Sequence, residues 1–128
     1  MPGHFKLAFD EFETTATNTF KDLLTDEHFT DFTLACADDK QIKAHKVILG
    51  SCSSILRNII MKIPQQNAVI YLKGIKFDEM KSVIDFMYLG ETKVKQEEFS
   101  TFMQIAQELN IKGLAVNEQN QKQKKSGE

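Results

Sequence analysis

The stretch FTDFTLACADDKQIKAHKVILGSCS, residues 29–53, decides the fold that we expect for this chain. Apolar side chains recur at every second position over residues 32–36, which predicts a half-buried strand. After the polar turn Asp-Asp-Lys, residues 41–45 alternate in the same way, so the two segments predict a β-hairpin. From Lys46 the apolar spacing becomes that of a helix, and we expect Val47, Ile48 and Leu49 to lie largely in the core. A hairpin that leads directly into helices is typical of an α+β domain.

A second alternating segment lies upstream of the hairpin, near the start of the chain. Phe5, Leu7 and Phe9 alternate with other residues and predict a short strand. This strand runs directly into a predicted helix and has no hairpin partner. Its backbone groups must therefore pair with a distant edge, for which another copy of the protein is one candidate. The apolar residues of the helix recur at helical spacing: Phe12, Ala16, Phe20, Leu23 and Leu24.

The helical run after the hairpin extends to a proline, with several serines able to cap its second helix. Ser51, Ser53 and Ser54 are each suitable caps by residue type. Pro64 marks the end of that helix, because proline disfavours helical backbone in the residue before it. The short apolar run AVIYL, residues 68–72, then predicts a strand that is buried on both faces.

Two amphipathic helices complete the predicted elements. Apolar residues recur at helical spacing over residues 77–87, and Gly90 supplies the C-terminal stop. A last helix covers residues 99–109. The sequence after Leu114 is polar and lacks apolar spacing, so we expect it to be disordered. The expected organisation is a disordered N-terminus at residues 1–4, one helix-rich α+β domain at 5–114, and a disordered linker or tail at 115–128.

The composition favours a single intracellular domain that does not bind nucleic acid directly. A length of 128 residues with 41% hydrophobic and 27% charged residues is typical of one globular core. The formal charge of −2 offers no attraction for a phosphate backbone. Two cysteines are too few for a disulfide scaffold, which favours a reducing compartment. The chain start does not resemble a signal peptide and no stretch is apolar enough for a membrane span.

No set of residues indicates catalysis, a cofactor or a metal. The three histidines lack the spacing of a zinc site, and we expect His45 to hydrogen-bond locally at its strand end. Asp31, His45 and Ser51 could form a triad, but no nucleophile elbow or glycine-rich turn accompanies them. Cys52 could be activated at a helix start, although a small buried thiol is favoured. We therefore predict a non-enzymatic domain with no catalytic, cofactor-binding or metal-ligating residues.

The apolar residues near the N-terminus instead indicate an interface. The strand and helix between Phe5 and Phe20 offer more apolar surface than a terminal extension needs. The run KQKK, residues 122–125, could assist nuclear import, but a solvated linker is the favoured interpretation.

Three segments of the chain together resemble the BTB/POZ domain: residues 29–53, 68–94 and 99–114. The resemblance covers roughly residues 5–114. The start FKLAFDEF and the end IKGL look most like the Tramtrack-type group, in which this domain usually precedes DNA-binding modules. The residues that stand at family positions are Asp31, Ala44, His45, Lys46, Leu49, Ser51, Phe86, Met87, Tyr88, Gly90, Glu91, Leu109, Ile111, Gly113 and Leu114.

The resemblance implies a fold and an assembly. The BTB/POZ fold is a helical cluster flanked by a small mixed sheet, and it forms a two-fold dimer. The first strand is exchanged between subunits and the first helices pack together. A charged pocket of the family falls on Asp31 and Lys46. By position, the dimer interface of this chain consists of Phe5, Leu7, Phe9, Phe12, Ala16, Phe20 and Leu23.

The resemblance also implies a function and its partners. We expect a protein–protein interaction domain that mediates homodimerisation and higher-order oligomerisation of a nuclear transcription or chromatin-architecture regulator. Other BTB proteins and corepressor or chromatin proteins are further expected partners. The alternative is a substrate adaptor for a cullin-3 ubiquitin ligase. The segment IPQQNAV, residues 63–69, lacks the acidic residue that such adaptors typically carry, which counts against this alternative.

Overall fold

The structure, a computed structural model, describes residues 3–114 of the chain. The expectations for residues 1–2 and 115–128 lie outside the described residues. The elements run in the order α1 (Phe12–Thr25), β1 (Phe32–Ala35), β2 (Gln41–Ala44), α2 (Lys46–Cys52), α3 (Ser54–Met61), β3 (Ala68–Tyr71), α4 (Phe77–Leu89), the 3-10 turn η1 (Gln96–Glu98) and α5 (Phe99–Glu108).

The predicted hairpin forms two strands of a small mixed sheet. β1 pairs antiparallel with β2 and parallel with β3, so the strand order is β2-β1-β3. In this register Leu34 lies between Ile42 on one side and Ile70 on the other. The sheet and the five α-helices of residues 3–114 confirm the predicted α+β class.

The hairpin turn forms without glycine because an aspartate supplies the left-handed residue. Asp39 has a φ of 65°, a conformation that Asp tolerates better than most residues. The Cys36 N–H donates to the Lys40 carbonyl at 2.8 Å and closes the turn. The same conformation at Gly90, with a φ of 81°, confirms the predicted stop of α4.

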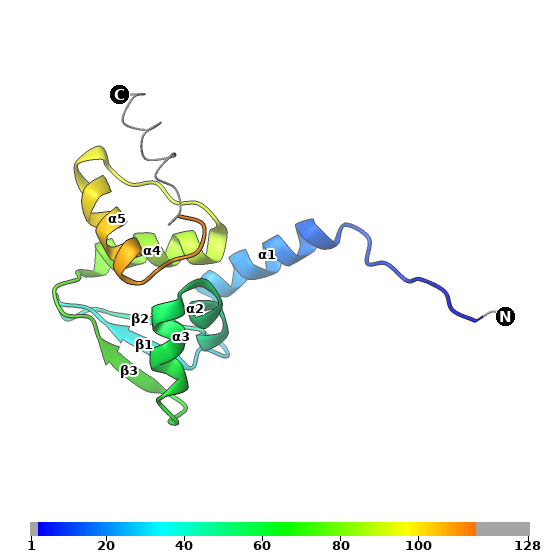
Figure 1. The fold of residues 1–128 in the computed structure, drawn as a ribbon, viewed down its shortest axis with the longest axis horizontal. Coiled ribbons are helices and arrows are strands. Elements are labelled where there is room, and N and C mark those ends of the chain that lie inside the picture. Colours follow the sequence, from blue (N-terminus) through cyan, green and yellow to red (C-terminus); the bar gives the residue numbers. More distant parts are fainter. Residues whose placement is uncertain (1–2, 115–128) are drawn as a thin grey trace.

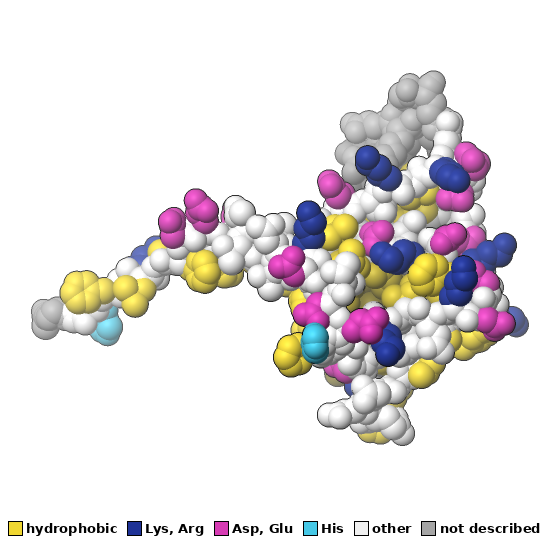
Figure 2. Space-filling view, turned by 180° about the vertical axis from the view of Figure 1, so that it is seen from behind, with side chains coloured by type: hydrophobic (Ala, Val, Ile, Leu, Met, Phe, Trp, Pro, Cys, Tyr) yellow, Lys and Arg dark blue, Asp and Glu magenta, His cyan; other side chains and the backbone are white. Residues whose placement is uncertain are grey.

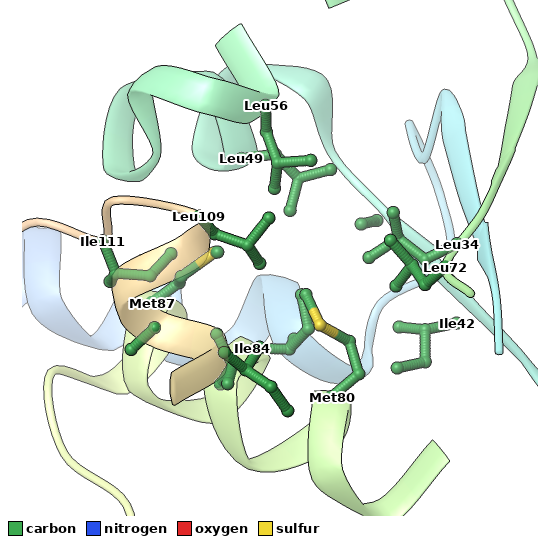
Figure 3. Packing of buried hydrophobic residues seen from close by; sticks show 14 of the residues in the cluster. Leu34, Ile42, Leu49, Leu56, Leu72, Met80, Ile84, Met87, Leu109 and Ile111 are labelled. Atoms are coloured by element: carbon green, nitrogen blue, oxygen red, sulfur yellow. The ribbon is translucent and has the colours of Figure 1, made fainter. Parts of the chain in front are cut away.

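Helix α4 lies at the centre of the packing. It contacts β2 and α2 on one side and α5 on the other, as the layers in Figure 1 show. Side chains from the sheet, from α2 and α3, and from α4 converge in one apolar core (Figure 3). Among residues 3–114, no helix has the length and apolar character that crossing a membrane requires. The labelled core residues are Leu34, Ile42, Leu49, Leu56, Leu72, Met80, Ile84, Met87, Leu109 and Ile111.

Ser53 is the serine that caps the second helix of the run. Its Oγ accepts the Leu56 N–H at 3.0 Å and donates to the Leu109 carbonyl at 2.5 Å. A bridge between Ser53 and Ile111 runs beside these bonds. The buried hydroxyl thus joins the start of α3 to the end of α5, and both of its bonds are shielded from water.

Two expectations about burial were wrong. β3 is not buried on both faces, because Val69 and Tyr71 are 58% and 61% exposed. Only Ala68 and Ile70 pack against the core, since no layer of the described chain covers the other face of the sheet. Val47, which the apolar run of α2 places with the core residues, also faces solvent, while Ile48 and Leu49 are buried.

The predicted N-terminal strand is not present in the single chain. Residues 3–9 adopt no regular structure, and no strand of the described residues pairs with them. This agrees with the lack of a hairpin partner. Its exchange with a second copy stays a prediction.

We expect Met80→Ala to lower the free energy of unfolding by about 2–5 kcal/mol. Met80 is 0% exposed at the centre of the core, so its removal leaves a cavity. Met61→Ala is the matched control, because Met61 is 70% exposed and its loss should change stability by less than about 0.5 kcal/mol. Denaturant unfolding at one protein concentration measures both. An equal loss of unfolding free energy in Met80→Ala and Met61→Ala would contradict the central position of Met80 in the core.

Candidate self-association surface

The N-terminal helix and the arm before it project from the rest of the molecule (Figure 1). No residue of α1 is buried, although the helix contacts α4 near its C-terminal end. Leu23 and Leu24 are the residues of α1 that pack, partly buried, against the core. Apart from Ala16, Leu23 and Leu24, every residue of α1 is exposed, as are residues 3–11.

This projection carries large apolar side chains, which Figure 2 shows in yellow along it. Phe5 and Leu7 are 93% and 91% exposed. Phe9 and Phe12 are exposed and contact each other edge to face, with ring centroids 5.5 Å apart, and Phe20 is also exposed. Burial of one such side chain gains roughly 1.5–3 kcal/mol. Exposed apolar side chains gathered in this way are typical of a surface that binds a partner.

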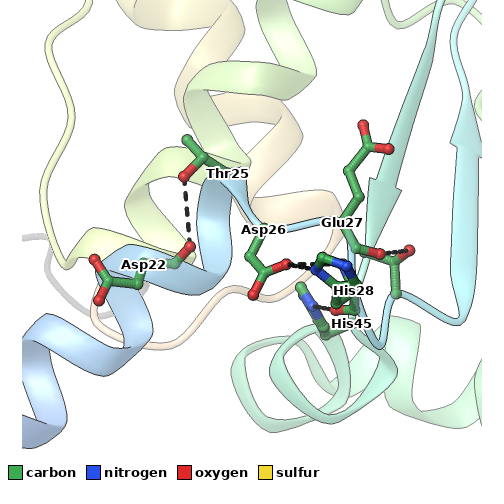
Figure 4. Close-up of polar contacts among 7 residues, drawn as sticks. Asp22, Thr25, Asp26, Glu27, His28 and His45 are labelled. Atoms are coloured by element: carbon green, nitrogen blue, oxygen red, sulfur yellow. Dashed lines mark hydrogen bonds and ion pairs between the residues drawn. The ribbon is translucent and has the colours of Figure 1, made fainter.

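The segment between α1 and β1 fixes the base of the projection (Figure 4). The Asp26 Oδ1 accepts the His28 N–H at 2.9 Å and lies 2.7 Å from His28 Nδ1. The Thr30 hydroxyl donates to the Glu27 carbonyl at 2.8 Å. The backbone and then the ring hydrogen bond from His28 hold the pKa of the Asp26 carboxyl below its ordinary value. The segment is a structured turn.

The buried ring of His45 holds this segment against the core. Its Nδ1 lies 2.8 Å from the Tyr88 hydroxyl, which also accepts the His45 N–H at 3.0 Å. Its Nε2 lies 3.2 Å from the His28 carbonyl. Since a carbonyl only accepts, Nε2 carries the proton and Nδ1 accepts from Tyr88. The expectation of a local bond was wrong, because these partners are 43 and 17 residues away.

The structure brings Asp31 and Lys46 together, but through the backbone. The Asp31 carboxylate accepts the Lys46 N–H at 2.7 Å, at the first residue of α2. The Lys46 ammonium instead donates to the Gln65 carbonyl at 3.1 Å. Within residues 3–114, no ion pair joins the two side chains. Asp31 thus acts as a helix cap from outside the helix, and the charged pocket stays a prediction.

Two exposed apolar residues near the base of α1 were not predicted as part of the surface. Phe29 is exposed in a left-handed conformation, with a φ of 68°. The bonds of its neighbours His28 and Asp31 to the start of α2 place it beside the helix turn that carries exposed Val47. The exposure of Val47 could have been predicted only from its outward position in the helix. No local pattern distinguishes Phe29.

An apolar groove lies on the opposite side of α4 from the sheet. It has a volume of about 620 Å³ and runs beside the extended segment 91–94. No hydrogen bond joins this segment to a strand of the described chain. Its apolar lining consists of Phe86, Val94, Phe99, Phe102, Met103 and Leu114.

The cysteines show no sign of activation. Cys52 is the last residue of α2, so the alternative that placed it at a helix start was wrong. Its thiol contacts the Met87 carbonyl at 3.8 Å. Burial raises the pKa of the Cys52 thiol, and Lys112 partly opposes this effect. Burial likewise raises the pKa of Cys36, with a smaller effect from Asp38.

The sequence matches the model of the BTB/POZ domain family over residues 20–126. Three similar proteins are from Drosophila melanogaster. The tramtrack alpha isoform is 37% identical over 86% of this chain, and bric-a-brac 1 is 34% identical over 87%. The chain spans only 13% and 11% of the lengths of these two proteins. The longitudinals lacking protein-like is 35% identical over 87% of each chain.

Two solved structures share the fold. The BTB domain of zebrafish PATZ1 has a TM-score of 0.72 at 18% identity, and covers 84% of this chain and 88% of its own. The BTB domain of human gigaxonin has a TM-score of 0.68 at 19% identity, and covers 85% and 89%. At these identities the likeness concerns the fold alone.

We expect Asp31→Ala to lower the free energy of unfolding by about 1 kcal/mol, because the Lys46 N–H loses its acceptor. Lys46→Ala keeps that N–H and should change stability by less than about 0.5 kcal/mol. Denaturant unfolding compares the two variants. A larger loss for Lys46→Ala would mean that the lysine side chain, and not its backbone, is the partner that matters.

Tyr88 should make stability depend on pH in the alkaline range. Burial raises the pKa of its hydroxyl from 10 to about 12. Its contribution is therefore complete below pH 10 and is lost as pH rises through 12, a fall of about 2–3 kcal/mol. Tyr88→Phe should remove this fall and cost about 1–3 kcal/mol at neutral pH, since His45 loses its partner.

Denaturant unfolding between pH 8 and pH 12 measures the alkaline effect. Tyr71→Phe, which alters the other tyrosine of the chain at an exposed position, is the control and should retain the fall. If Tyr88→Phe showed the same loss of stability at alkaline pH as wild type, another titrating group would be responsible for that loss.

Proposed function

Because the chain belongs to the BTB/POZ domain family, we propose that it is a self-associating protein-interaction domain. The proposed unit is a homodimer that assembles into higher oligomers. The observation that carries the proposal is the row of exposed aromatic and aliphatic side chains on the arm and α1. Such a surface is costly in water and is stabilised by a partner that covers it.

A second copy is the occupant that fits this surface best. The side chains of Phe5, Leu7 and Phe9 alternate along the arm and can face one apolar surface together. The groove beside segment 91–94 offers such a surface, and the backbone of this segment pairs with no strand of residues 3–114. We propose that the arm of one copy adds to this segment of the other, while the two α1 helices pack across the dimer axis.

The base of α1 supports this arrangement because its direction is fixed by buried contacts. His45 and Tyr88 hold the turn that follows the helix, so the exposed face of α1 is presented in one orientation. Phe29 and Val47 lie at that base and extend the proposed interface beyond the residues predicted from the sequence. Preorganisation of this kind lowers the entropy lost on association.

The biological setting of the assembly is inferred from the relatives. The similarity to tramtrack and bric-a-brac 1 supports a nuclear regulator of transcription or chromatin architecture. Self-association would bring several copies of such a regulator together on DNA. Other BTB domains and corepressor or chromatin proteins are further proposed partners, and nucleic acid is not contacted by this domain, whose net charge is −2.

The test is the mass of the full chain in solution. We expect size-exclusion chromatography with light scattering to give at least a dimer at micromolar concentration. Changing Phe5, Leu7 and Phe9 together to serine should reduce the mass, because the arm loses its apolar face. The same change at Lys6 and Ala8, on the other face of the arm, is the control and should leave the mass unchanged. A wild-type monomer would refute the proposal.

A further inference from the structure

The outer edge of β3 has no partner within residues 3–114. The Leu72 N–H donates to the Ala35 carbonyl at 2.8 Å, so the backbone of Leu72 and of alternate residues before it faces β1. The backbone groups of Val69 and Tyr71 must then point away from the sheet. Each contributes one donor and one acceptor to an open edge.

This edge lacks the features that protect the other edge of the sheet. β2 carries Lys43, an exposed charge of the type that blocks pairing between sheets. β3 reads Ala-Val-Ile-Tyr and contains no charge, proline or glycine. Val69 and Tyr71 are both exposed and both lie on the outer face. An unprotected apolar edge strand is a site where another strand pairs.

We infer that β3 pairs antiparallel with β3 of another copy, about a two-fold axis at Ile70. This inference rests on the proposed self-association and supplies it with a second interface, separate from the arm and α1. One continuous sheet of six strands would result, with Val69 and Tyr71 of both copies on its outer face. An edge that pairs with its own copy needs a self-complementary sequence.

The sequence around β3 meets this requirement. With Ile70 opposite its own copy, Val69 lies opposite Tyr71, and both have backbone groups that face outward, so they can exchange hydrogen bonds. Asn67 falls opposite Lys73, which avoids a contact between like charges. A register shifted by one residue would place opposed side chains on different faces of the sheet, which strand geometry forbids.

A charge placed on the edge tests the interface. In the full chain we expect Val69→Lys to reduce the mass of the higher oligomer to that of the dimer, measured by light scattering. Gln41→Lys is the matched control, since it adds the same charge at an exposed position on the opposite edge of the sheet and should leave the mass unchanged. Circular dichroism checks that both variants remain folded.

The outcomes separate this inference from the proposed function. A wild-type monomer would overturn both. A wild-type dimer with no larger species would overturn only the β3 interface, as would a higher oligomer that Val69→Lys leaves intact. A mass reduced by Val69→Lys and retained in Gln41→Lys supports it.

A cysteine cross-link tests the register. Ile70 opposite its own copy would form a non-hydrogen-bonded pair with Cα atoms about 4.5 Å apart, within the range of a disulfide. A mild oxidant should therefore link the Ile70→Cys chain into covalent dimers on a non-reducing gel. Val69→Cys, which would face Tyr71, and wild type, which retains Cys36 and Cys52, should not link. Equal linking of Val69→Cys and Ile70→Cys would overturn the register.

Discussion

The buried imidazole of His45 is the contact on which the arrangement of the chain depends. One ring connects three parts that are distant in sequence: the end of the hairpin, the turn after α1, and α4 through Tyr88. Each of its nitrogens has a partner, and the Tyr88 hydroxyl is bound twice. A polar group so far from water is tolerated because none of its hydrogen bonds is missing. The core fixes α4, α4 fixes His45, and His45 fixes the base of the projecting helix.

The two halves of the molecule differ in how their apolar residues are used. In the part of the chain after residue 30, the side chains of the sheet and of the helices bury one another around α4. Before it, α1 and the arm bury almost nothing within the chain, although they hold several of its ten phenylalanines. A chain that folds alone buries only Leu23 and Leu24 of this helix in part against its core. The helix becomes favourable when its contacts come from outside the chain, which is how structure and proposed assembly are connected.

Local pattern predicted most of the fold and little of the long-range contact. The hairpin and helices followed from periods of two and about 3.6, and Gly90 from its conformational freedom. The exposure of one face of β3 could not be predicted from the sequence. A short apolar run has the same pattern whether one face of the strand or both faces are covered. The partnership of His45 with Tyr88 joins residues with no local relation. For the arm, alternation indicated a surface, and only geometry showed how much of it the chain leaves uncovered.

The contrast between the two edges of the sheet has a consequence for the shape of an assembly. β2 carries a lysine and β3 does not, so the proposed pairing would extend the sheet at one edge only. A unit with one such edge and one dimer surface can bind two other units. Units of this kind form linear chains or closed rings and cannot branch. The angle between the two axes, and not the strength of either contact, would then decide whether growth stops at a small number of copies or continues as a filament.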